Sequence, residues 1–126
     1  MGQQQLFLIV LGVIIVSIAV VVGINLFTAN AVSANRDGVV ADLTNLRTMA
    51  QEYYRKPTAM GGGGYTFTGW SIVGTKLDTT PNGVYVPTVA AQSVTIVGTG
   101  NELNAGSKIK HTSTITSTTI TTVKTN

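Results

Sequence analysis

Apolar residues in this chain are concentrated at its N-terminal end. Between Leu6 and Phe27 there is no charged residue, and the first charge anywhere in the chain is Arg36. A run of about 20 apolar residues is long enough to span a bilayer. Because this run is apolar on every side, it predicts a helix that is surrounded by lipid or by other helices around its whole circumference.

From Arg36 onward the apolar residues occupy one face only. They recur at spacings of three and four residues, as in a helix that packs along one side. No proline occurs before Pro57. We therefore predict one helix from about Gln3 to Arg55, roughly 80 Å long. The apolar stripe of its second half consists of Val32, Val39, Leu43, Leu46, Ala50 and Tyr53.

Two features are expected to interrupt or end this helix. Weak helix formers lie between Gly23 and Gly38 and favour a bend or a locally melted turn there. Pro57 prevents the helix from continuing, and the four glycines at 61–64 predict a flexible hinge. The predicted organisation is a helix at 1–56 (apolar half 1–30, amphipathic half 31–56), a glycine-rich hinge at 57–64 and a β-rich domain at 65–126.

The residues after the hinge are typical of β-strands. Turn signals occur at 81–83 and at 98–101, and the apolar spacing of the Thr-rich tail slips near 117–119, where a bulge or a turn is predicted. We therefore expect an α+β fold, in which the amphipathic half of the helix packs on a small antiparallel sheet of about four strands. The segments predicted as strands are Tyr65–Trp70, Gly83–Val86, Ser93–Val97 and parts of the tail from Lys108 to Lys124.

Composition and charge narrow the function classes. The formal net charge is +3, the basic residues are scattered and cysteine is absent, so we expect no nucleic-acid partner and no thiolate metal site. His111 stands alone among Thr and Ser and is interpreted as a surface residue, because a metal site needs further ligands. Asp37, Asp42 and Glu52 lie among arginines and are interpreted as solvated ion pairs. The sequence predicts neither an enzyme nor a cofactor.

The order of these features resembles the type IV pilin superfamily, which includes pseudopilins and related archaeal filament subunits. A short polar N-terminus precedes an apolar helix, which continues into an amphipathic half, a glycine-rich segment and a β-rich domain. The resemblance implies a structural subunit that polymerises helically through its hydrophobic helix into an extracellular filament. It also implies identical subunits as partners, a pilus-type assembly machinery, and residence in the inner or cytoplasmic membrane before assembly.

The resemblance also assigns roles to positions in the helix. The family usually has a glutamate at the fifth mature position, which offsets the N-terminal amine of a neighbouring subunit, whereas Gln5 here carries no charge. No basic leader precedes Met1, so either it was removed from the numbered chain or this lineage assembles without it. Small residues along one helix face let neighbouring helices approach closely. The predicted assembly interface is Gln5, Phe7, Gly12, Ala19, Gly23 and Phe27, and the predicted helix–sheet docking residues are Val39, Leu43, Leu46 and Tyr53.

A plain membrane anchor is the alternative function. In that case residues 6–27 would cross the bilayer once and display a β-rich binding or adhesion domain. The amphipathic continuation of the helix favours the filament, because an anchored domain usually hangs on a tether. A filament subunit instead needs a rigid helix that docks its own sheet.

Overall fold

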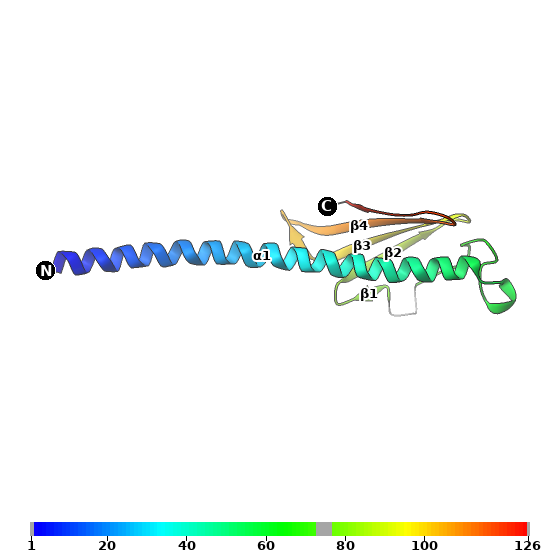
Figure 1. Ribbon diagram of the computed structural model, residues 1–126, viewed down its shortest axis with the longest axis horizontal. Helices are drawn as coiled ribbons and strands as arrows, with labels where there is room; N and C mark the ends of the chain where they lie inside the picture. Colours follow the sequence, from blue (N-terminus) through cyan, green and yellow to red (C-terminus); the bar gives the residue numbers. More distant parts are fainter. Residues whose placement is uncertain (1, 73–76, 126) are drawn as a thin grey trace.

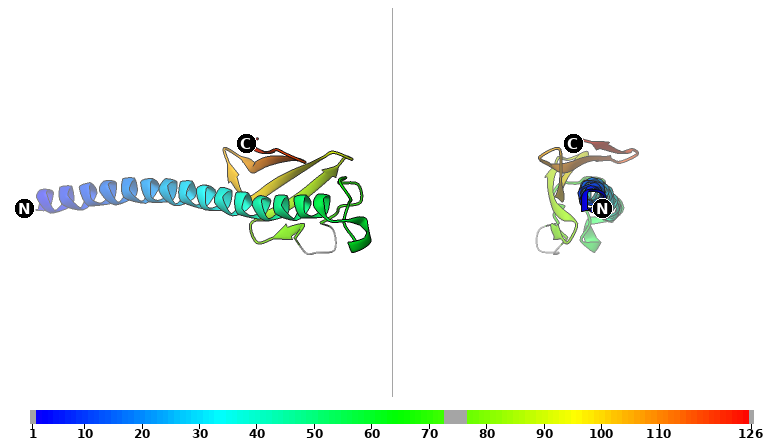
Figure 2. Two further views of the ribbon diagram at one scale, coloured as in Figure 1. Left: turned by 45° about the vertical axis from the view of Figure 1, so that its right-hand side comes forward. Right: turned by 90° about the vertical axis from the view of Figure 1, so that its left-hand side faces the viewer.

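A long helix and an antiparallel sheet make up the two layers of the computed structural model, which describes residues 2–72 and 77–125 (Figure 1). The helix, α1 (Gly2–Arg55), is 54 residues long. Its first half projects beyond the sheet, and its second half lies across one sheet face (Figure 2). The predicted α+β class is confirmed. The remaining elements are η1 (Thr58–Met60), β1 (Thr79–Thr80), β2 (Gly83–Val89), β3 (Ser93–Asn104), β4 (Ser107–Thr116) and β5 (Ile120–Lys124).

The locally melted turn predicted between Gly23 and Gly38 is wrong, because α1 is helical at every residue of that segment. Its polar residues do not break the helix. The Thr28 hydroxyl donates to the carbonyl of Ile24 at 3.0 Å, four residues earlier. Gly38 serves close packing, since a Cβ there would lie 2.5 Å from Oδ1 of Asn82 on the sheet side.

The five strands form a meander in the order β1-β2-β3-β4-β5, and each pairs antiparallel with the next strand in sequence. The predicted turn near 117–119 is confirmed, since it connects β4 to β5. It is closed by a hydrogen bond from the Thr116 N–H to the carbonyl of Thr119 at 2.8 Å. The described residues form five strands, where about four were expected: the short edge strand β1 was not predicted, and the tail forms two strands, β4 and β5.

The glycines predicted as a hinge form hydrogen-bonded turns that cap the end of α1. The N–H groups of Gly63 and Gly64 donate to the carbonyls of Tyr53 at 2.7 Å and Lys56 at 3.0 Å. Gly64 has a positive φ of 59°, which glycine adopts without strain. The turns satisfy carbonyls that the last turn of any helix leaves without an intrahelical partner.

The strand predicted at Tyr65–Trp70 is wrong, because this segment is irregular, with a turn at 68–69. Tyr65 has a φ of 67° and is 71 % exposed, whereas Phe67 is fully buried, so the two aromatic rings do not share a face. The Tyr65 N–H donates to the carbonyl of Tyr54 on α1 and the Phe67 N–H to the carbonyl of Ala91. The backbone of this segment therefore connects the helix end to the β2–β3 turn.

The core lies between the second half of α1 and the inner sheet face, mainly over β3 and β4. Gly98 of β3 lies directly beneath the helix, where a Cβ would be 3.0 Å from Cγ1 of Val39 and 2.9 Å from the Tyr85 ring. The absence of a side chain at this position lets α1 approach the strand closely. The buried apolar residues are Val39, Leu43, Leu46 and Ala50 of α1 with Phe67, Trp70, Ile72, Tyr85, Val94, Ile96, Ile109 and Ile115.

Candidate assembly surface

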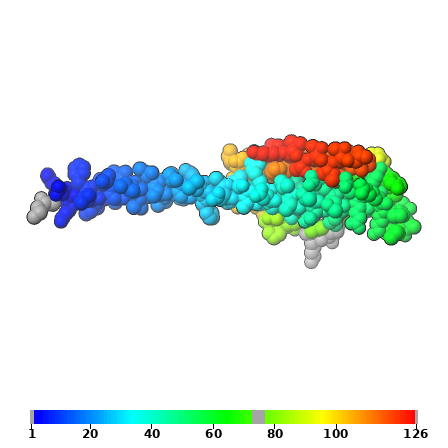
Figure 3. All heavy atoms as spheres, viewed as in Figure 1, coloured from blue at the N-terminus to red at the C-terminus, as the bar shows by residue number. Residues whose placement is uncertain are grey.

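The first half of α1 is apolar and projects beyond the sheet. Every residue from 2 to 30 is exposed, and Phe7 and Phe27 have exposed fractions of 81 % and 76 %. Figure 3 shows this half as a narrow rod extending from the rest of the molecule. A continuous apolar surface of this extent is rare on a soluble monomer and marks a surface that lipid or another protein covers. We call residues 2–30 of α1 the projecting helix.

Three small residues of the projecting helix share one face. At about 100° per residue, Gly12, Ala19 and Gly23 lie within about 40° of one another around the helix axis, and Gln5 falls in the same sector. A Cβ built on Gly12 or Gly23 would meet nothing within 4 Å. No contact within the subunit therefore requires a glycine at either position, although each lowers helix propensity.

The large aromatic residues of the predicted interface do not share that face. By the same count, Phe27 lies about 60° from Gly12 and Phe7 about 140° from it. The six predicted residues therefore divide into four that form one small or polar face and two that do not. Each of the six is exposed in the single subunit.

The sheet docks on the opposite side of the helix. Val39 lies about 180° around the axis from Gly12. Val39 and Leu43 are fully buried and Leu46 is 2 % exposed, so these three predicted docking residues lie in the core. Tyr53 is only half buried, and its hydroxyl donates to the carbonyl of Thr68 at 2.8 Å, so it contacts the loop after the helix. The sheet consequently does not cover the small-residue side of α1.

A polar cluster fixes α1 to the β1–β2 turn. The prediction that Asp42 forms a solvated ion pair is wrong, because its Oδ2 accepts hydrogen bonds from the Tyr85 hydroxyl at 2.5 Å, Thr80 Oγ1 at 2.7 Å and Asn82 Nδ2 at 3.1 Å. Burial alone would raise the pKa of Asp42, but the three hydrogen bonds outweigh it and lower the pKa below its usual value. Burial, followed by the bond to Asp42, raises the pKa of Tyr85. These partners are 38 to 43 residues away in sequence, and no local pattern indicates them.

His111 is buried beneath the sheet, with 7 % of its surface exposed, so its interpretation as a surface residue is wrong. It follows Ile109 on the inward face of β4 and lies opposite Lys124 of β5. Its Nε2 has no hydrogen-bond partner among the described residues. Burial lowers the pKa of His111, and the positive charges of Arg36 and Lys124 lower it further. Period-two alternation with Ile109 is the sequence signal that indicates this inward position.

Comparison of the chain with known protein families, curated proteins and solved structures finds no match. The architecture itself is pilin-like: a long apolar N-terminal helix whose second half packs on a C-terminal antiparallel sheet. By length and composition, α1 can also cross a membrane. Such a helix indicates membrane association or secretion.

Proposed function

We propose that this protein is the structural subunit of an extracellular, type IV pilus-like filament. The observation that carries the proposal is the uninterrupted passage of α1 from an exposed apolar half into a half that packs on its own sheet. A helix of this kind holds the sheet at a fixed distance from the filament axis. The partners of the subunit are identical copies, the membrane before assembly, and a pilus-type assembly machinery.

Helix packing is the expected source of the assembly free energy. Transfer of the projecting helix from lipid to a bundle of identical helices exchanges one apolar environment for another, so the hydrophobic effect contributes little. Close contact between helix backbones supplies van der Waals attraction instead. Gly12, Ala19 and Gly23 allow this contact. Because they lie opposite the docking stripe, neighbouring helices reach them without displacing the sheet.

Gln5 is the proposed contact for the N-terminal amine of a neighbouring subunit. It lies on the same helix face as the small residues, close to the N-terminal end of α1. Its amide oxygen accepts a hydrogen bond from an ammonium group but does not neutralise its charge. The contact is therefore weaker than the glutamate contact that is usual in type IV pilins.

Electron microscopy of material sheared from the cell surface tests the proposal. Cells that produce the full chain are expected to carry long, uniform fibres, whereas a chain that begins at Ala31 is expected to be soluble and monomeric by sedimentation. The truncated chain keeps all the buried residues of the core, so loss of fibres would not reflect loss of the fold. Membrane-bound full-length protein without fibres would support the anchor function, and fibres formed by the truncated chain would refute assembly through the projecting helix.

A further inference from the structure

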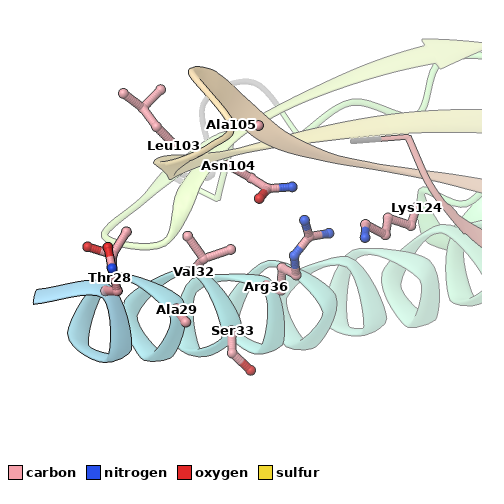
Figure 4. A pocket seen from close by; sticks show the side chains of 10 residues that line it. Thr28, Ala29, Val32, Ser33, Arg36, Leu103, Asn104, Ala105 and Lys124 are labelled. Carbon is pink, nitrogen blue, oxygen red and sulfur yellow. The ribbon is translucent and has the colours of Figure 1, made fainter. Parts of the chain in front are cut away.

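A pocket of about 540 Å³ lies where α1 emerges from beneath the sheet. Figure 4 shows its walls: α1 on one side and the tip of the β3–β4 hairpin on the other, with Lys124 of β5 beside Arg36. Thr28 and Asn104 contribute polar groups to the lining. We call this cavity the neck pocket.

Two cationic side chains line the neck pocket. Its lining contains Arg36 and Lys124 and, among the described residues, neither Asp nor Glu. The two cationic side chains extend into the same space between helix and sheet (Figure 4). Their field acts on the neighbouring His111, whose pKa is lowered by burial and then by these two charges. An anion in the pocket would be attracted by both charges and would find hydroxyl and amide donors nearby.

The position of the pocket along α1 places it at the depth of lipid headgroups. Residues 6–27 extend over about 33 Å, close to the roughly 30 Å thickness of the hydrocarbon core of a bilayer. Thr28 follows directly, and Arg36 lies about 13 Å beyond Phe27 along the helix axis, so the pocket begins at the hydrocarbon boundary and extends outward. Leu103 at the hairpin tip is 53 % exposed on the same side and supplies an apolar contact at that boundary.

We propose that the neck pocket binds the phosphate of an anionic phospholipid headgroup while the subunit resides in the membrane. The proposal rests on the membrane stage of the proposed function. The headgroup phosphate lies between Arg36 and Lys124, and its acyl chains run beside the projecting helix. Free phosphate has the same charge chemistry. However, a free anion would need neither a pocket at the level of the lipid headgroups nor the exposed apolar side chain of Leu103. Bound lipid fixes both the depth and the rotation of the subunit before assembly.

Vesicle flotation of the purified full chain tests this proposal. Binding to phosphatidylcholine vesicles is compared with binding to vesicles of phosphatidylcholine mixed with phosphatidylglycerol. A basic residue that is merely near an anionic membrane surface strengthens binding by about fivefold. Lys124→Gln is expected to reduce the preference for phosphatidylglycerol by more than that factor, because it also removes a charge-assisted contact with the phosphate. Lys110→Gln is the matched control, because Lys110 is exposed on β4 outside the pocket and carries the same charge.

Each outcome distinguishes the neck pocket from another explanation. If the Lys110 and Lys124 variants lose the preference for phosphatidylglycerol equally, general surface charge explains that preference, and the proposal is overturned. Equal competition by inorganic phosphate and by phosphatidylglycerol would identify a free-anion site instead of a lipid site. Equal binding to both kinds of vesicle would overturn the pocket proposal alone, whereas failure to bind either kind would overturn the membrane stage and this proposal with it.

Discussion

Replacement of Tyr85 by Phe tests the hydrogen-bond cluster that fixes α1 to the sheet. The Tyr85 side chain is 2 % exposed, and its hydroxyl donates to a carboxylate that also accepts from Thr80 and Asn82. A hydrogen bond to a charged group contributes about 1.5–3 kcal/mol to stability. Because Asp42 is partly exposed and keeps two other donors, we expect the variant to lose about 1–2 kcal/mol.

Asp42→Ala is expected to be more destabilising than Tyr85→Phe. It leaves the buried Tyr85 hydroxyl without its acceptor, and an unsatisfied buried polar group costs about 1–3 kcal/mol. The half-exposed Thr80 and Asn82 can bond to water instead. In the double variant neither partner is left unsatisfied, so the two losses are expected to be less than additive.

The contribution of Asp42 should depend on pH in a defined direction. The pKa of Asp42 is lower in the folded protein than in the unfolded chain, so its stabilisation is present above the unfolded value, near 4. It is lost as the pH falls through the folded value. The difference in stability between the parent and Asp42→Ala should therefore shrink on acidification below about pH 4.

Urea unfolding of the full chain in a non-ionic detergent measures these differences. Trp70, the single tryptophan, is 7 % exposed and packs in the core, so its fluorescence reports loss of the helix–sheet contact. Val40→Ala on the exposed side of α1 is the control and should change stability by less than about 0.5 kcal/mol. Equal stability of the parent and Tyr85→Phe at pH 7, or additive losses in the double variant, would refute the coupling between Asp42 and Tyr85.

Three further predictions concern assembly. Gly23→Leu should leave the amount of protein in the membrane unchanged but reduce the number of filaments, because it adds bulk to the small-residue face. The control variant Val22→Leu should have little effect. Normal filaments from the Gly23 variant would place the contact on another face of the helix. Gln5→Glu should preserve or raise the melting temperature of the filament, because it supplies a negative charge opposite the N-terminal amine of the neighbouring subunit. Gln5→Leu should lower the melting temperature. Equal melting temperatures for the two variants would exclude contact between position 5 and that amine. Truncation after Ser117 removes β5 and the hydrogen bond from Arg47 to Thr122 at 2.9 Å. The truncated filaments should therefore have a lower melting temperature and a lower protease resistance. Unchanged values would show that β5 is dispensable.

Periodicity predicted the helix and its packed stripe because both depend on local spacing. The observed end of α1 at Arg55 follows from Pro57, and Val39, Leu43 and Leu46 are buried as a spacing of three and four residues requires. Alternation in the tail likewise predicted the turn near 117–119. These features depend on neighbours within a few residues, which the sequence shows directly.

The errors arose where distant contacts decide the structure. Alternation at Tyr65–Trp70 is typical of a strand, but hydrogen bonds to the end of α1 and to Ala91 hold that segment in an irregular conformation outside the sheet. Asp42 looks like a solvated charge until Tyr85 is brought beside it. The neck pocket brings α1 beside a hairpin tip that lies 67 to 80 residues later in the sequence, so only the folded structure reveals it.

The meander order of the sheet has a consequence for how the chain acquires its structure. Each strand pairs with the next strand in sequence, so most of the sheet forms by closing short loops, which is rapid and entropically inexpensive. Docking of the sheet on α1 is the step that closes a long loop, between Leu43 and strands some 50 to 70 residues later. We therefore expect the hairpins to form before the sheet docks, and in the proposed membrane stage the first half of α1 would be helical in lipid while they form. Because α1 is synthesised before the sheet, the helix is already present when the completed hairpins pack against it.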